Sequence, residues 1–159
     1  MLVFLYNLYL KYGASTTYYP DIITHLVARQ SEFLIAGFGY NASIEPSTID
    51  PSMTLSIDGQ ILGRIVEGCN AVSVIILFIA FMISFFGGWR RTLLYSFAGM
   101  ALIYTINIVR IALLTVGIHE YPAYSEVLHG TIFPAIIYGS VLLLWLGWVR
   151  SYQKTANAN

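Results

Sequence analysis

Three side chains in this sequence could together carry out acyl transfer: a thiol, a guanidinium and an imidazole. Cys69 is the only cysteine, and it lies in Glu67-Gly68-Cys69-Asn70, where a polar stretch meets a long apolar run. Arg110 lies inside a later apolar segment, and His129 directly precedes another. A thiolate attacks carbonyl carbons, a guanidinium can stabilise an oxyanion, and an imidazole transfers protons. The chemistry therefore depends on whether the fold brings these groups to one place.

The composition predicts that this place is at a membrane. Of 159 residues, 57% are hydrophobic and 10% are charged, and the mean hydropathy is +0.70, whereas soluble domains carry about 25% charged residues. The zero formal net charge gives no support for a nucleic-acid partner. One cysteine excludes an intrachain disulfide and a cysteine-cluster metal site, and we expect neither a metal nor a cofactor. We interpret residues 1–159 as one membrane-embedded domain.

The apolar segments predict transmembrane helices. A bilayer core of about 30 Å requires roughly 20 apolar residues in a helix. Residues 71–86, 92–117 and 131–149 qualify or nearly qualify, and residues 1–12 are expected to form a short or incomplete first helix. The predicted fold class is therefore an all-α polytopic membrane protein with about four transmembrane helices. Residues 69–149 would form its catalytic helical core.

Basic residues near the predicted spans indicate their orientation. Arg90 and Arg91 lie in the short connection between two spans, and Arg150 begins the tail at 150–159. Cytoplasmic loops carry an excess of Lys and Arg, so we expect both regions on the cytoplasmic side. Cys69 and His129 would then face outward, which is the periplasmic side of a bacterial inner membrane.

The predicted outer segment, residues 13–68, has its own structure. Residues 20–40 carry apolar side chains at helical spacing, which predicts an amphipathic helix on the membrane surface. Residues 41–52 contain two prolines and small polar residues and are interpreted as a loop. Residues 53–66 alternate in polarity around Asp58-Gly59, which predicts a short β-hairpin leading into the cysteine motif.

Arg110 is the charge that most needs an explanation. It lies seven positions before Gly117, so about 10 Å from the outer end of its predicted helix. A charge within a span costs at least ~2.5 kcal/mol, and such residues usually face a polar interior. Snorkelling toward the surface is the alternative. Asn107, one turn earlier on the same helical face, could hold the guanidinium in place.

Cys69 also has two interpretations. At the beginning of its predicted helix, the partial positive charge of the helix terminus would favour the thiolate. A free cysteine at a membrane boundary can instead be a small, inert, partly buried side chain. His129, His119 and His25 are all expected on the outer side, and only their placement relative to Cys69 would distinguish them.

The motifs resemble those of a known family. Glu67-Gly68-Cys69-Asn70 resembles the Glu-Gly-Cys-Asn signature of the exosortase/archaeosortase family. Asn107 to Ile111 resembles the family's Asn-x-x-Arg-Ile element, and His129-Gly130 resembles its histidine-containing element. The three occur in the family's order, and the small size and outer hairpin are similar to the compact exosortase F branch. Ala71 stands where many members have glycine.

The resemblance implies a membrane cysteine transpeptidase or protease. Such enzymes are thought to process C-terminal sorting signals that combine a short recognition motif, a transmembrane helix and a basic cluster. The resemblance implies that Cys69 is the nucleophile, Arg110 the oxyanion stabiliser and His129 the general acid/base, and Glu67, Asn70 and Asn107 would support them. The partners would be exported proteins that carry such a signal and the lipid bilayer.

Two other function classes remain open on the sequence. A non-enzymatic transport or anion-binding subunit would need Arg110 and Asn107 but not Cys69. A lipid-linked thiol acyltransferase would form the same thioester with a lipid donor.

The three histidines provide the first test. We expect His129→Ala to cause a large loss of turnover and His119→Ala and His25→Ala to cause small ones, because only one imidazole can serve the thiol. Turnover of a membrane-anchored substrate by each variant measures this. A dominant effect at His119 would contradict the assignment.

Overall fold

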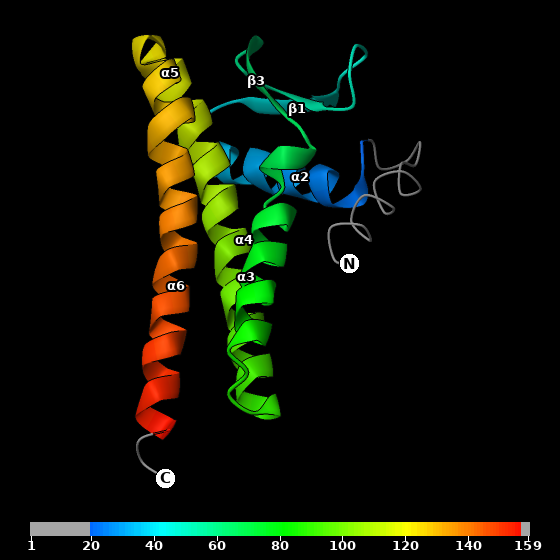
Figure 1. Cartoon of the computed structure of the whole chain (residues 1–159). Coiled ribbons are helices and arrows are strands. Elements are labelled where there is room, and N and C mark those ends of the chain that lie inside the picture. Colours follow the sequence, from blue (N-terminus) through cyan, green and yellow to red (C-terminus); the bar gives the residue numbers. More distant parts are fainter. Residues whose placement is uncertain (1–19, 157–159) are drawn as a thin grey trace.

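The computed structural model describes residues 20–156 and shows a tall set of helices with a small sheet at one end (Figure 1). The helices α3 (Val72–Ser84), α4 (Trp89–Glu120) and α6 (Phe133–Ala156) run lengthwise. Short helical turns connect α4 to α6 beside the sheet: η2 (Pro122–Tyr124), α5 (Ser125–Val127) and η3 (Leu128–Ile132). The first helix predicted at residues 1–12 lies outside the described residues.

Two continuous helical stretches are long and apolar enough to cross a membrane. They are Trp89–Glu120 and Pro122–Ser151, and they contain the predicted spans 92–117 and 131–149. The third predicted span is shorter than expected, because α3 has 13 residues and so rises only about 20 Å. The backbone explains where it begins and ends: Ala71 before it has a φ of 62°, and Phe85 after it leaves the helical region with a ψ of 58°. Four transmembrane helices are therefore not seen in the described part of the chain.

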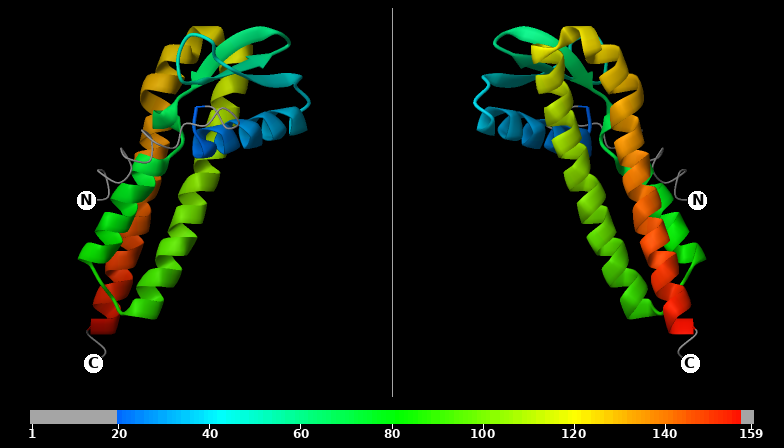
Figure 2. Two further views of the ribbon diagram at one scale, coloured as in Figure 1. Left: turned by 90° about the vertical axis from the view of Figure 1, so that its right-hand side faces the viewer. Right: turned by 90° about the vertical axis from the view of Figure 1, so that its left-hand side faces the viewer.

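Helix α2 (Ile22–Gly37) runs crosswise to α4 at the level where the sheet begins (Figures 1 and 2). Its start is capped by Asp21, whose Oδ1 accepts hydrogen bonds from the N–H groups of Ile23 and Thr24, each at 3.0 Å. The predicted helix is confirmed, and its position on the membrane surface stays a prediction. The face between α4 and the sheet buries both small and large side chains, whereas four large apolar residues remain exposed. The buried residues are Thr24, Val27, Ala28, Ser31 and Ile35, and the exposed ones are Ile22, Leu26, Phe33 and Phe38.

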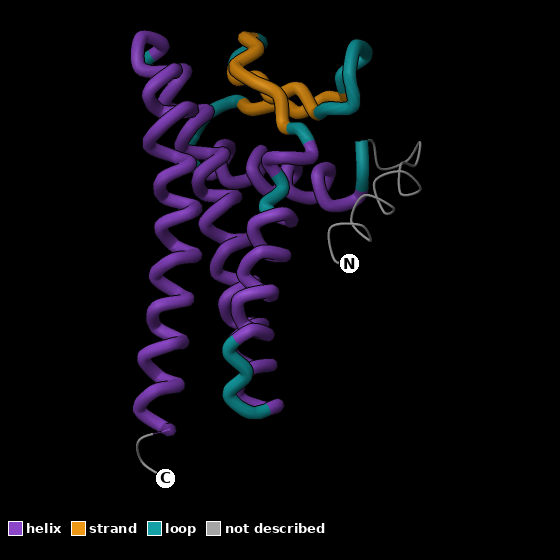
Figure 3. Tube along the Cα trace, viewed as in Figure 1, coloured by secondary structure: helices purple, strands orange, loops and turns teal. Residues whose placement is uncertain are grey.

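The outer segment forms a three-stranded antiparallel sheet and not only a hairpin (Figure 3). Its order is β1 (Ala42–Pro46), β2 (Met53–Ile57) and β3 (Gln60–Ile65). The predicted hairpin is confirmed, and its turn places Asp58 at φ 51° and Gly59 at φ 79°, the left-handed pair that favours Asp-Gly. The loop predicted at 41–52 is partly wrong, because Ile44 pairs with Leu55 and is buried. The predicted helical fold with a short hairpin therefore gains one further strand, β1.

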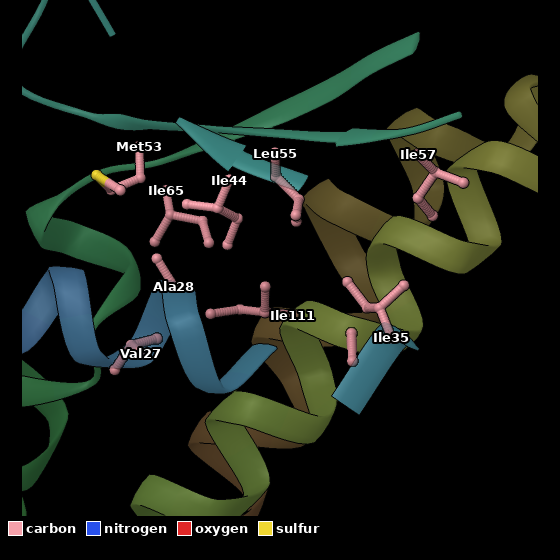
Figure 4. Close-up of a cluster of buried hydrophobic side chains, with 10 residues drawn as sticks. Val27, Ala28, Ile35, Ile44, Met53, Leu55, Ile57, Ile65 and Ile111 are labelled. Carbon is pink, nitrogen blue, oxygen red and sulfur yellow. The ribbon is translucent and has the colours of Figure 1, made fainter. Parts of the chain in front are cut away.

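One helix joins two apolar cores. Ile111 and Ala112 of α4 belong to a cluster with α2 and the sheet (Figure 4). Farther down the same helix, Ile103 packs with Phe78 of α3 and Val141 of α6. The upper part of α4 is therefore fixed against the outer segment and its lower part against the other long helices.

The contact between α3 and α4 predicts a sensitive glycine. A Cβ at Gly99 of α4 would overlap the fully buried ring of Phe78. We expect Gly99→Ala to destabilise the protein by about 1–3 kcal/mol, because overpacking forces side chains and backbone apart. Unfolding followed by tryptophan fluorescence in detergent micelles measures this.

Gly139→Ala in α6 is the matched control, because a Cβ there meets no atom within 4 Å. Equal stabilities of the two variants would show that α3 and α4 do not approach as closely as the structure indicates.

Candidate functional site

Three separate parts of the chain meet at one small cavity below the sheet. Cys69 comes from the turn after β3, Arg110 from α4 and His129 from η3, and all three line a cavity of about 80 Å³. The rest of the lining is mostly aliphatic: Leu55, Leu62, Gly63, Arg64, Ile65, Ile111, Leu114, Thr115 and Ile118. The structure thus brings together the three residues that the sequence singled out.

Cys69 ends a single 3-10 turn, η1 (Glu67–Cys69), and does not lie in the first turn of a long helix. Its N–H donates to the carbonyl oxygen of Val66 at 2.8 Å, and helix α3 begins only at Val72. The prediction that Cys69 starts the second helix is therefore wrong by three residues. The reason lies in Ala71, whose left-handed backbone separates the turn from the helix.

The residues after Cys69 hold this turn in place. The side chain of Asn70 is buried; its Oδ1 accepts from the N–H of Val72 at 3.0 Å, and its Nδ2 donates to Thr24 Oγ1 at 3.2 Å. The φ of 62° at Ala71 lies in the region that costs an L-residue roughly 1–2 kcal/mol and that glycine adopts freely. That backbone explains why glycine suits this position in the family that the motif resembles.

Asn107 connects the nucleophile's turn to the arginine. Its buried side chain donates from Nδ2 to the carbonyl oxygen of Cys69 at 2.7 Å. Its Oδ1 accepts from a terminal nitrogen of Arg110 at 3.4 Å. One amide thus fixes the backbone of Cys69 and contacts the guanidinium one turn along α4.

Arg110 keeps unused hydrogen-bonding capacity. Its Nε is buried and has no acceptor among the described residues, and within the same residues no carboxylate forms an ion pair with it. A buried charged donor without a partner is costly, so this group is suited to an oxygen supplied by a ligand in the cavity.

His129 is the histidine that the fold places at the cavity. It lies on the π-helical turn η3, is exposed, and lines the cavity rim; turns of this kind are frequent at functional sites. His119 instead packs its ring edge-on against Tyr40, with centroids 5.8 Å apart, and His25 lies on α2. Neither lines the cavity.

The top of α4 is also tied to the outer segment by a polar contact. The Tyr40 hydroxyl donates to Glu120 at 3.0 Å, and this hydrogen bond raises the pKa of Tyr40 above its usual range. Glu67, in contrast, opens the η1 turn and is half-buried without lining the cavity.

Two residues near the site were not selected from the sequence. Thr24 is fully buried on α2 and bonds Asn70, which is 46 positions away. A threonine within an apolar stripe was the only available signal, and its partner could not be read from spacing. Gly63 lines the cavity from β3, and a glycine inside an alternating strand was its signal.

Fold and cavity define a mostly helical protein with apolar helices of membrane-spanning length and a Cys–Arg–His pocket. The family model for transmembrane exosortases matches residues 2–149. The chain therefore belongs to the transmembrane exosortase family, which is a family of membrane cysteine transpeptidases. A search of curated proteins gave no match, and neither did a search of solved structures. The family prediction is confirmed, while the exosortase F branch stays a prediction.

The bond between Thr24 and Asn70 generates a prediction. Thr24→Val keeps the shape but removes the hydroxyl acceptor, so we expect a loss of about 1–3 kcal/mol in stability and a looser cysteine turn. Thermal unfolding and the rate of Cys69 alkylation measure the two effects.

Thr24→Ser is the matched control, because it keeps the hydroxyl. If Thr24→Val behaves like the unsubstituted protein in both measurements, α2 does not hold the turn through this bond.

Proposed function

We propose that this chain is a membrane cysteine transpeptidase or protease that cleaves the C-terminal sorting signals of membrane-anchored exported proteins. In this proposal Cys69 is the nucleophile, Arg110 stabilises the oxyanion and His129 is the general acid/base. The observation that carries it is the buried Arg110 Nε, which lacks an acceptor among the described residues and belongs to a side chain lining the same cavity as Cys69 and His129.

The free capacity of Arg110 suits the transition state of acyl transfer. Attack on a carbonyl turns its oxygen into an anion, and donors arranged in advance around that oxygen lower the barrier. A guanidinium offers several donors in one plane. Asn107 limits the movement of Arg110 by its contact at 3.4 Å, so the donors need little rearrangement during the reaction.

The depth of the site suits a membrane-anchored substrate. Asn107 lies 18 positions after Trp89 at the lower end of α4, so about 27 Å farther along the helix at 1.5 Å per residue. That is close to the ~30 Å thickness of the hydrocarbon core. Cys69, bonded to Asn107, would then lie near the outer boundary, where a substrate chain leaves its own transmembrane helix.

The proposed reaction has two steps and begins with the thiolate of Cys69 and a protonated His129. The Cys69 thiolate attacks the scissile carbonyl carbon, and the developing oxyanion accepts hydrogen bonds from Arg110. The C–N bond then breaks, the leaving amine takes a proton from His129, and a thioester on Cys69 remains. Water or an incoming amine attacks the thioester while His129 removes its proton, and the Cys69 thiolate leaves, which restores the thiolate and the protonated imidazole. Within the described residues no hydrogen bond joins the three side chains, as is common before substrate binds.

The basic residues support an orientation in the membrane. The beginning of α4 and the end of α6 lie at the end opposite the sheet (Figure 1). They carry Arg90, Arg91 and Arg150, whose excess predicts the cytoplasmic side. The cavity would therefore open toward the periplasm of a bacterial inner membrane.

Arg110→Lys tests the role of the guanidinium. A lysine keeps the charge but not the planar set of donors, so we expect activity to fall on the order of 10²-fold or more, as when one oxyanion donor is lost. Processing of a co-expressed membrane protein with a C-terminal sorting signal, followed by immunoblot, measures this.

Arg29→Lys is the matched control, because Arg29 forms an exposed ion pair with Glu32 on α2. We expect this variant to process the substrate at the normal rate. Cys69→Ala should abolish processing while the protein still accumulates in the membrane. Normal processing by Cys69→Ala would refute the enzymatic proposal and favour a transport or anion-binding role.

A further inference from the structure

The cavity beside Cys69 extends under the sheet as an aliphatic hollow. Leu55 and Ile65 point from the sheet toward Ile111 of α4 (Figure 4). With Leu114 and Ile118 they give the cavity mostly aliphatic walls, which Arg64 and Thr115 interrupt, while Cys69, Arg110 and His129 meet at its other side. A ligand that reacts with Cys69 therefore has an apolar space next to its reacting atom.

Gly63 leaves the strand side of this space without a side chain. In the sheet Gly63 pairs with Leu55, and paired residues project from the same face. Leu55 is buried on the face toward α4, and so is Ile65, two positions after Gly63. Gly63 is exposed and lines the open side of the cavity, so a side chain at position 63 would project over this opening, where a Cβ meets no atom within 4 Å.

The backbone does not require a glycine at this position. Gly63 is not in the left-handed region, unlike Gly59 in the neighbouring turn. The register shift between Leu55 and Ser56 leaves Leu62, not Gly63, as the extra residue of β3. A glycine inside a strand weakens it and often marks a place where a ligand approaches closely, and the open space favours that explanation.

The size of the hollow limits what can enter. The cavity measures about 80 Å³, roughly half of the 150 Å³ that accepts benzene in an engineered core cavity. It therefore suits a group of about three or four heavy atoms, the size of a small aliphatic side chain. β3 is at an edge of the sheet, so an extended chain lying along it would direct every second side chain toward the cavity.

We propose that the hollow under Gly63 is a substrate subsite that takes one small aliphatic side chain next to the scissile bond. Gly63 is then the residue that sets the upper size limit of this side chain. This inference rests on the proposed role of Cys69 as the nucleophile, and it names one feature of the substrate that the site accepts.

Alkyl methanethiosulfonates test the hollow without an identified substrate. The Cys69 thiolate attacks the sulfenyl sulfur, a disulfide to the alkylthio group forms, and methanesulfinate leaves. Because Cys69 is the only cysteine of the chain, all label on this protein reports on this site. Rates are measured in membranes with methyl, isopropyl and benzyl reagents, and the ratio of isopropyl to methyl rates reports on the hollow.

In the unsubstituted protein we expect the isopropyl reagent to be favoured over the methyl and benzyl reagents. Gly63→Val should lower the isopropyl-to-methyl ratio on the order of 10-fold or more, since one methylene in a hydrophobic pocket changes discrimination by roughly 10–200-fold. Gln60→Val is the control, because Gln60 is an exposed residue of the same strand that does not line the cavity, and it should leave the ratio unchanged.

If the Gly63→Val variant reacts with the methyl reagent at an unchanged rate, it is folded. If that rate collapses, the Gly63→Ala variant is used instead, and we expect it to lower the isopropyl-to-methyl ratio by a smaller factor. Equal ratios in the unsubstituted protein and in the folded variant would overturn the subsite. That result would leave Cys69 as a nucleophile, because loss of processing in Cys69→Ala tests the nucleophile independently.

Discussion

The site depends on the side chain of Asn107, which connects α4 to the turn that carries the thiol. Its Nδ2 holds the carbonyl oxygen of Cys69 at 2.7 Å, and its Oδ1 contacts Arg110 at 3.4 Å. Because this amide is buried, its hydrogen bonds are formed away from competing water and are costly to break. Asn107 is thus the polar connection between the cysteine turn and the arginine.

The rest of the fold serves to keep that connection in place. α4 packs against α2 and the sheet near Ile111 and against α3 and α6 near Ile103, so the height of Asn107 along α4 is fixed from both sides. From the other direction, Thr24 of α2 holds Asn70. The cysteine turn is thus held by two helices that cross, while β3 leads into it and leaves a hollow at Gly63.

The sequence predicted the features that depend on neighbouring residues, such as turns and long helices, and did not predict those that depend on contacts between distant residues. The hairpin followed from Asp58-Gly59, because its left-handed turn is set by two adjacent residues. The long helices followed from their apolar runs. Strand β1 was missed, since five residues ending at Pro46 become a strand only by pairing with β2. The motifs indicated Cys69, Arg110 and His129, but the Thr24–Asn70 bond joins residues too far apart in sequence to be inferred from it.

The central claim is that Cys69 carries the acyl group of the substrate. Acid quenching during processing of a membrane-anchored substrate, followed by mass spectrometry of the protein's peptides, tests it most directly. The account predicts that the peptide containing Cys69 gains the mass of the substrate fragment and loses it on treatment with neutral hydroxylamine, as a thioester does. A fragment bound to any other residue, or continued processing with Cys69 replaced by alanine, would contradict it.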